Sequence, residues 1–141
     1  MSDVNELIGI LDLEPLDLDM FRGQTPDDGG RRIYGGQVIA QSLAAAYRTI
    51  EGRHCHSLHC YFIRPGDPRV PILFKVERVR DGGSFAVRRV VAIQHGAQIF
   101  NLAASFQTPE VGFEHQAEMP SAPDPETLLN EEQLRELAGE G

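Results

Sequence analysis

The chain of 141 residues has a formal net charge of −8, with 13 Lys and Arg against 21 Asp and Glu. This length predicts one ordinary domain that buries about two-thirds of its unfolded surface without a disulfide or a metal. The acidic balance argues against a nucleic-acid binder, and no apolar run is long enough to span a bilayer. We therefore expect neither nucleic acid nor a membrane as a partner.

The negative charge lies at the C-terminal end of the chain. Residues 1–108 carry 12 acidic and 12 basic residues, whereas residues 109–141 carry nine acidic residues and one base, Arg135. The bases of the first part are arginines except for Lys75. Guanidinium groups suit phosphate and carboxylate ligands, so this part is compatible with a small phosphorylated ligand.

The first predicted elements are a short helix and a strand. The helix has Ser2 or Asp3 as its N-cap, and its apolar residues recur at helical spacing. Apolar and acidic residues then alternate over residues 16–21, which predicts one half-buried strand that ends at Gly23, followed by a loop over residues 25–32. The apolar positions of the helix are Val4, Leu7, Ile8 and Leu11.

Residues 33–50 are the most informative segment. They predict a helix with Arg48 as its one charge and with Gly35 and Gly36 near its start. A helix with so little charge must be enclosed on most sides. The two glycines suit either an anion or polarised carbonyl at the helix start, or close packing of a buried helix, and we favour close packing. We expect one face to carry Ile39, Leu43, Ala46, Tyr47 and Ile50, and Ala40, Ala44 and Ala45 to keep the other side thin.

Four strands are predicted after this helix, over residues 55–63, 70–80, 84–94 and 97–107. Short turns at residues 81–83 and 95–96 favour an antiparallel meander. The expected fold class is therefore α+β, with a curved antiparallel sheet wrapped around one central helix.

Two residue types in the first of these strands could carry chemistry. Cys55 and Cys60 are predicted to point to opposite faces, so we expect no local disulfide, reduced thiols and a cytoplasmic location. Their C-x4-C spacing does not match a common zinc site, and we expect no metal. By the same parity His54 and His56 share one face and His59 lies on the other, so an incidental role is favoured over a metal site or a histidine base.

Residues 109–141 are predicted to be an acidic, proline-rich linker. It contains one helical pattern, capped by Asp124 and continued through Leu128, Leu129, Leu134 and Leu137. This composition is typical of a segment between domains. We expect the natural chain to continue past Gly141.

Two long runs resemble a known family. FRGQTPDDGGRRIYGGQVIAQSLAAA, residues 21–46, and the run that begins HSLHCYFIRPGDPRV at His56 and ends with VGFEHQ at Gln116 are similar to the N-terminal half of acyl-CoA thioesterase II, of the hotdog superfamily. The resemblance covers about residues 5–125. It implies two tandem hotdog repeats, residues 1–108 being the first, and hydrolysis of fatty acyl-CoA to free fatty acid and CoA without a cofactor, as part of fatty acid and lipid metabolism.

The resemblance also implies that the catalytic Asp, Thr or Ser, and Gln belong to the second repeat. The position that would carry the Asp falls near Gly36, which has no side chain to act as a base. Gln37, Ser84 and Gln107 are only weak catalytic candidates. We therefore expect little hydrolysis by this span alone. The candidate substrate-binding residues are Gly35, Gly36, Arg64, Ser84 and Arg88, with Arg78, Arg80 and Arg89 as further candidates for the CoA phosphates.

Two alternatives are kept. A free-standing hotdog domain could bind acyl-CoA or a fatty acid without turnover, and pair with itself to bury its sheet edge. A hotdog dehydratase or hydratase would need a base aimed at the substrate β-carbon, for which His59 is the tempting residue. In the favoured interpretation the partner is a second hotdog repeat or a second copy of this domain, as part of a homo-oligomer.

Overall fold

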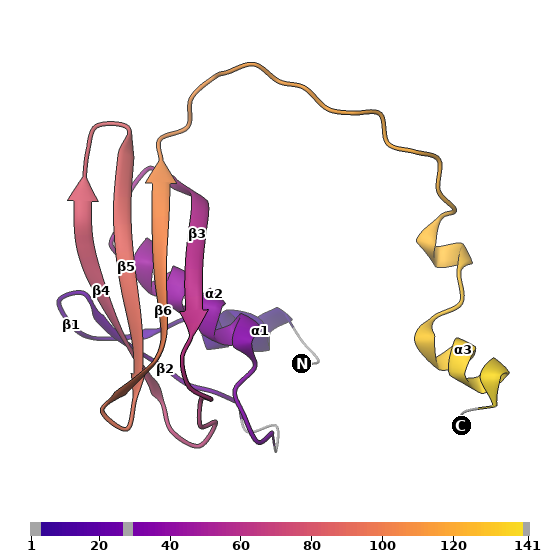
Figure 1. Cartoon of the computed structure of the whole chain (residues 1–141), viewed down its shortest axis with the longest axis horizontal. Helices are drawn as coiled ribbons and strands as arrows, with labels where there is room; N and C mark the ends of the chain where they lie inside the picture. The colour runs from indigo at the N-terminus through magenta and orange to yellow at the C-terminus, as the bar shows by residue number, and fades with distance from the viewer. Residues whose placement is uncertain (1–3, 27–29, 140–141) are drawn as a thin grey trace. The chain divides into compact units, whose positions relative to one another are not determined.

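The computed structural model describes residues 4–26 and 30–139, and the predicted sheet with one central helix is confirmed (Figure 1). The strands form one six-stranded antiparallel sheet in the order β1-β2-β4-β5-β6-β3. Strands β4 to β6 are the predicted meander, and β3 crosses over to the edge beside β6. The elements are α1 (Val4–Leu11), β1 (Glu14–Asp17), β2 (Met20–Gly23), α2 (Gly35–Tyr47), β3 (His54–Phe62), β4 (Ile72–Asp81), β5 (Phe85–Gln94) and β6 (Ala97–Gln107).

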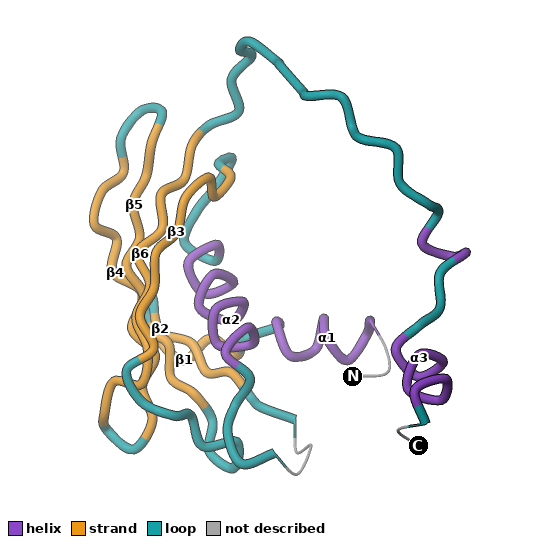
Figure 2. Tube along the Cα trace, turned by 45° about the vertical axis from the view of Figure 1, so that its right-hand side comes forward, coloured by secondary structure: helices purple, strands orange, loops and turns teal. Residues whose placement is uncertain are grey.

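The core lies between α2 and one face of the sheet (Figure 2). Alternate residues of the central strands point into it, and they combine large side chains with alanines that let the helix approach closely. In β6 these are Phe100, Leu102, Ala104 and Phe106, and in β5 they include Ala86, Val90 and Ala92.

The buried face of α2 differs from the predicted one. The fully buried residues of the helix are Val38, Gln41, Ser42, Ala45 and Ala46, whereas Ile39 and Leu43 are only partly buried against the rim of the core. Small residues occupy the centre of the contact between α2 and the sheet because they allow the helix to lie close to the strands. Gln41 tolerates burial because its Nε2 donates to the carbonyl oxygens of Ile10 and Gln24, at 3.0 and 2.9 Å.

The prediction of a single strand over residues 16–23 is wrong, because this segment belongs to the hairpin β1–β2. Asp19 adopts a left-handed φ of 56° in the turn, and the Asp17 carboxylate accepts a bond from the Leu18 N–H at 2.7 Å. Aspartate is among the residues that tolerate this conformation and form local turns. Phe21 and Gly23 of β2 face the core, while Leu18 is exposed in the turn.

A β-bulge in β3 overturns the parity expected for its cysteines and histidines. Cys55 pairs with Phe106 and Ser57 pairs with Ser105, so His56 is one extra residue. Cys55 and Cys60 therefore both pack against the core, as free thiols. The histidines are exposed, and His56 Nε2 lies 2.8 Å from Ser105 Oγ on the outer face of the sheet. Bulges have this effect because the extra residue reverses the alternation.

The chain divides into two units, residues 1–110 and residues 111–141. Every described residue of the second unit is exposed. Its predicted helix is interrupted: Asp124 caps only the 3-10 turn η1 (Pro125–Thr127), and Asn130 starts a separate helix α3 (Glu131–Ala138) through a capping box with Gln133. Among the described helices, none is long and apolar enough to cross a membrane.

Candidate functional site

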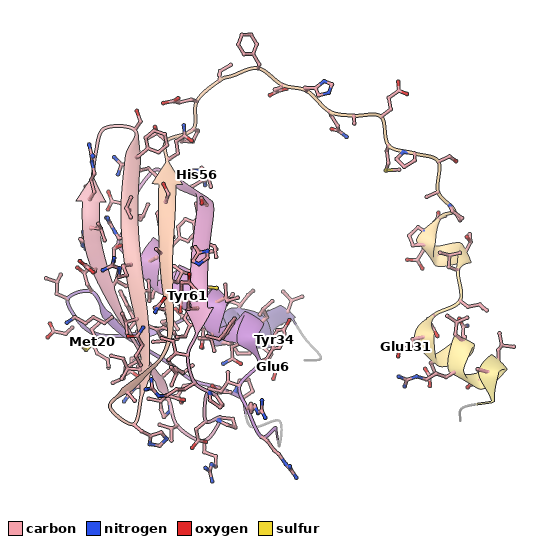
Figure 3. The ribbon with its side chains drawn as sticks, viewed as in Figure 1. Glu6, Met20, Tyr34, His56, Tyr61 and Glu131 are labelled. Atoms are coloured by element: carbon pink, nitrogen blue, oxygen red, sulfur yellow. The ribbon has the colours of Figure 1, made fainter. Side chains whose placement is uncertain are left out.

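A pocket of about 300 Å³ lies between α1 and the first turns of α2, and we call it the α1–α2 pocket. Its walls are mainly apolar, because α1 turns its aliphatic residues toward the helix that carries Gly36 and Ala40. Polar groups enter from Glu6, Tyr34 and Gln37; Figure 3 shows Glu6 and Tyr34 near one another at this end of the sheet. The aliphatic lining consists of Leu7, Ile10 and Leu11.

Two glutamines one helical turn apart fix the walls of this pocket. Gln37 Nε2 donates to Thr25 Oγ1 at 3.1 Å and, more weakly, to Gln24 O at 3.3 Å. Gln41 connects the same segment to the end of α1. The amide nitrogen of Gln37, a weak catalytic candidate from the sequence, is therefore engaged in holding the segment after β2 against α2.

Gly35 and Gly36 lie directly beneath two aromatic rings. A Cβ on Gly36 would lie 2.4 Å from Tyr34 Cε1, and a Cβ on Gly35 would lie 3.0 Å from Phe62 Cζ. Tyr34 is the N-cap of α2, and it forms no side-chain capping bond. The close-packing role of the glycine pair therefore has a direct structural basis, since any side chain would displace one of the rings.

A second pocket, of about 450 Å³, opens on the other side of the first turn of α2. Gly35 lines it together with Arg32, Arg64, Phe62 and Ile99, and we call it the arginine pocket. Arg64 is anchored by a bond from Nη1 to the Gln98 carbonyl oxygen at 2.5 Å. Two of the predicted substrate-binding residues, Gly35 and Arg64, are thus brought together here.

Arg88 is a structural residue, which corrects its proposed role in substrate binding. Its side chain is 1% exposed, and its nitrogens donate to five acceptors: Thr49 Oγ1 and O, Asp81 Oδ1, and the carbonyl oxygens of Arg80 and Val87. A guanidinium has five N–H groups, so its capacity is used. This ion pair lowers the pKa of the Asp81 carboxyl. Arg88 therefore fastens the segment after α2 to the sheet.

Two of the three remaining arginine candidates, Arg78 and Arg89, are paired with carboxylates, and the third, Arg80, is exposed. Arg78 forms a forked interaction with Asp19, with Nε and Nη2 both 2.9 Å from carboxylate oxygens. Arg89 contacts Glu77 at 3.4 Å. Neither residue lines the α1–α2 pocket or the arginine pocket.

Ser84 and Gln107 lie at the opposite end of the sheet from the start of α2. The Ser84 carbonyl accepts the N–H of Thr108, the residue after β6, at 3.0 Å, and Gln107 is the last residue of β6. The start of α2 adjoins Ile99, near the beginning of that strand. The structure therefore does not bring Ser84 and Gln107 together with Gln37.

Sequence reasoning missed Glu6, and named His59 only as the tempting base of the dehydratase alternative. Glu6 brings a carboxylate to the α1–α2 pocket from α1 rather than from α2, and an exposed glutamate on a short amphipathic helix has no local signal that distinguishes it. His59 packs edge-on against Tyr61, with ring centroids 4.7 Å apart, and does not line either pocket. Within the described part of the chain, no contact of His59 favours the dehydratase alternative.

The comparison with known proteins decides the family. The family model of the acyl-CoA thioesterase N-terminal domain matches residues 24–107, which include the three glycines that line the two pockets, Gly35, Gly36 and Gly66. The chain belongs to this family. The match spans the segment from the end of β2 to the last residue of β6, so it covers α2 and most of the sheet.

Relatives of this acyl-CoA thioesterase N-terminal domain are similar over most of its length. Acyl-coenzyme A thioesterase 8 of Homo sapiens is 50% identical over 127 residues, which cover 89% of this chain and 40% of the relative. The crystal structure of the acyl-CoA thioesterase II TesB2 of Mycobacterium marinum has a TM-score of 0.76 at 50% identity, and covers 85% of this chain and 45% of the other. The chain thus spans less than half the length of these relatives.

A more distant structure supports the fold. A conserved protein with a hotdog fold from Alicyclobacillus acidocaldarius has a TM-score of 0.72 at 22% identity, with 86% of this chain and 47% of the other covered. The acyl-CoA thioesterase N-terminal domain described here therefore has the hotdog fold that its sequence predicts.

Proposed function

We propose that the chain is the N-terminal half of an acyl-CoA thioesterase, which hydrolyses fatty acyl-CoA to free fatty acid and CoA in lipid metabolism. The observation that carries this proposal is its 50% identity to a human acyl-coenzyme A thioesterase, of which it spans 40%. The two pockets at the start of α2 also support the proposal, because they could hold the two ends of such a substrate. They offer arginines for phosphate groups and an apolar space for an alkyl chain.

Hydrolysis needs a base that activates water beside the thioester carbonyl. Among the residues that the structure describes, no carboxylate or histidine lines the arginine pocket. In the α1–α2 pocket Gln37 cannot accept a proton, and Glu6 is exposed to solvent. We propose that a second hotdog repeat, or a second copy of this domain, supplies the catalytic carboxylate and closes the site.

The exposed edge of the sheet supports a partner of this kind. Strand β3 pairs with β6 on one side only, and it exposes Leu58, Tyr61 and Phe62. An unpaired edge with apolar side chains invites pairing with another strand. We propose that it joins a second repeat or a second copy in a homo-oligomer, and we propose a cytoplasmic location because Cys55 and Cys60 are both free thiols.

Thiol release from acyl-CoAs of several chain lengths tests this function. We expect a polypeptide that continues beyond Gly141 into a second repeat to release CoA, with the human relative as a positive control. Binding of acyl-CoA without release of CoA by that longer polypeptide would contradict the proposal, and would favour the free-standing binding domain instead.

A further inference from the structure

The first turn of α2 separates two pockets that differ in the charge of their side chains. Gly35 lines the arginine pocket, and the next residue, Gly36, lines the α1–α2 pocket. Consecutive Cα atoms are about 3.8 Å apart. A ligand with two different ends could therefore reach both pockets by crossing a single helical turn.

The arginine pocket combines two positive charges, Arg32 and Arg64, with a lining that is otherwise largely apolar. Arg32 and Arg64 are both exposed, and no acidic residue among residues 4–26 and 30–139 lines this pocket. The acid nearest to Arg64 along the chain, Asp67, is held by Arg69 with Nε and Oδ1 2.9 Å apart. Two guanidinium groups without a carboxylate in the same pocket suit phosphate oxygens, which accept charge-assisted hydrogen bonds.

The α1–α2 pocket has the opposite preference. Leu7, Ile10, Leu11 and Ala40 supply apolar walls, and the one ionisable acid in its lining is Glu6. An alkyl chain gains free energy by burying its surface against such walls, whereas a carboxylate at the rim repels phosphate groups. The charges of the two pockets therefore favour one orientation for a ligand that carries phosphates at one end and an alkyl chain at the other.

Taking the ligand class from the proposed function, we infer that acyl-CoA binds across the first turn of α2 in one orientation. Its phosphate-bearing end lies in the arginine pocket, on Arg32 and Arg64, and its acyl chain lies in the α1–α2 pocket, against Leu7 and Ala40. The N-terminal domain is then the part of the enzyme that sets the direction of the substrate and senses the length of its acyl chain.

Binding by the whole chain tests this orientation, measured by calorimetry with three probes: free CoA, an uncleavable dodecyl thioether of CoA, and dodecanoate. The double variant Arg32→Gln/Arg64→Gln should weaken binding of CoA and of the thioether alike, by roughly tenfold or more, because charge-assisted bonds are lost. It should leave dodecanoate binding unchanged. Ala40→Phe fills the apolar pocket, and should weaken binding of the thioether and of dodecanoate but not of CoA.

Matched control variants lie on the exposed side of the sheet. Arg89→Gln and Ala103→Phe repeat the same changes at exposed positions outside both pockets, and should bind all three probes as the wild type does. Leu7→Gln, on the exposed helix α1, gives a second test of the apolar pocket if Ala40→Phe fails to fold. It should weaken binding of the thioether without affecting CoA.

Three results would overturn the orientation: a loss of CoA binding in Ala40→Phe or Leu7→Gln, unchanged CoA binding in the arginine variant, or no binding of any probe by the wild type. Failure of the proposed function would give a different result. It would appear as no thiol release by the longer polypeptide, whatever the binding pattern of this chain.

Discussion

At the scale of single residues, Arg88 shows how a buried charge stabilises this fold. Its five hydrogen bonds connect Thr49, just after α2, with the β4–β5 hairpin, so one side chain joins the helix to the sheet. A buried guanidinium is tolerated because every N–H group has an acceptor. The neighbouring Arg89 points the other way and is exposed.

Arg88→Leu should therefore lower the free energy of unfolding by about 3 kcal/mol, because it leaves buried carbonyl groups without donors. The adjacent change Arg89→Leu should alter it by less than about 0.5 kcal/mol, because the Arg89–Glu77 pair is exposed to solvent. Urea unfolding followed by circular dichroism gives both values. Equal effects of the two substitutions would contradict the structural role of Arg88.

The pH dependence of stability provides a second test of the same ion pair. The hydrogen bond from Arg88 lowers the pKa of Asp81, so its contribution is fully present above the ordinary aspartate pKa of about 4. Below that pH the unfolded chain binds the proton first, and the contribution is lost as the pH falls through the lowered pKa. The stability difference between wild type and Asp81→Asn should be constant from about pH 5 to 8 and should shrink below about pH 4. A difference that does not change down to about pH 2 would argue against this pair.

At the scale of elements, what could be predicted depended on how local the signal was. Strands β4 to β6 follow from alternating residues and short turns, and the turn before β6 uses positive φ at both His95 and Gly96, as a tight hairpin requires. The bulge at His56 could not be predicted, because one extra residue leaves no mark in the alternation. The face of α2 was misassigned because the burial of Gln41 depends on acceptors far away in the sequence.

The bulge leads to a prediction about single-residue deletions in β3. Deleting His56 removes the extra residue and keeps the pairs Cys55–Phe106 and Ser57–Ser105, so the melting temperature should fall only slightly. Tyr61 is also exposed but lies outside the bulge. Its deletion would turn either Phe62 or residues 57–60 onto the wrong face of the sheet. It should cost about 2 kcal/mol or more. Equal losses for both deletions would contradict the assigned register.

At the scale of the whole molecule, the folded unit and the acidic tail differ in burial and in charge. The core cluster ends at Phe106, and the tail carries nearly all of the net charge. The α+β class was predictable because the central helix and the meander are visible in sequence. The candidate site was less predictable, since Glu6 reaches the pocket of Gly36, and Arg64 the pocket of Gly35, only through the tertiary fold.

Removing residues 111–141 should leave the melting temperature within about 2 °C of that of the whole chain, because no core residue is lost. The shortened chain should be less soluble near neutral pH, because its net charge is close to zero. Thermal unfolding and solubility measurements at the same ionic strength check both parts. A large fall in melting temperature would show that the tail contributes to the core.

The central claim is that this chain provides half of a catalytic cleft and that the base comes from another repeat or another copy. Thiol release by the purified 141-residue chain, compared with the longer polypeptide at equal concentration, tests it most directly. The account predicts release by the longer polypeptide, and no release above the uncatalysed rate by the short chain. Comparable turnover by the short chain, lost in Glu6→Gln, would contradict it by placing the base in the α1–α2 pocket.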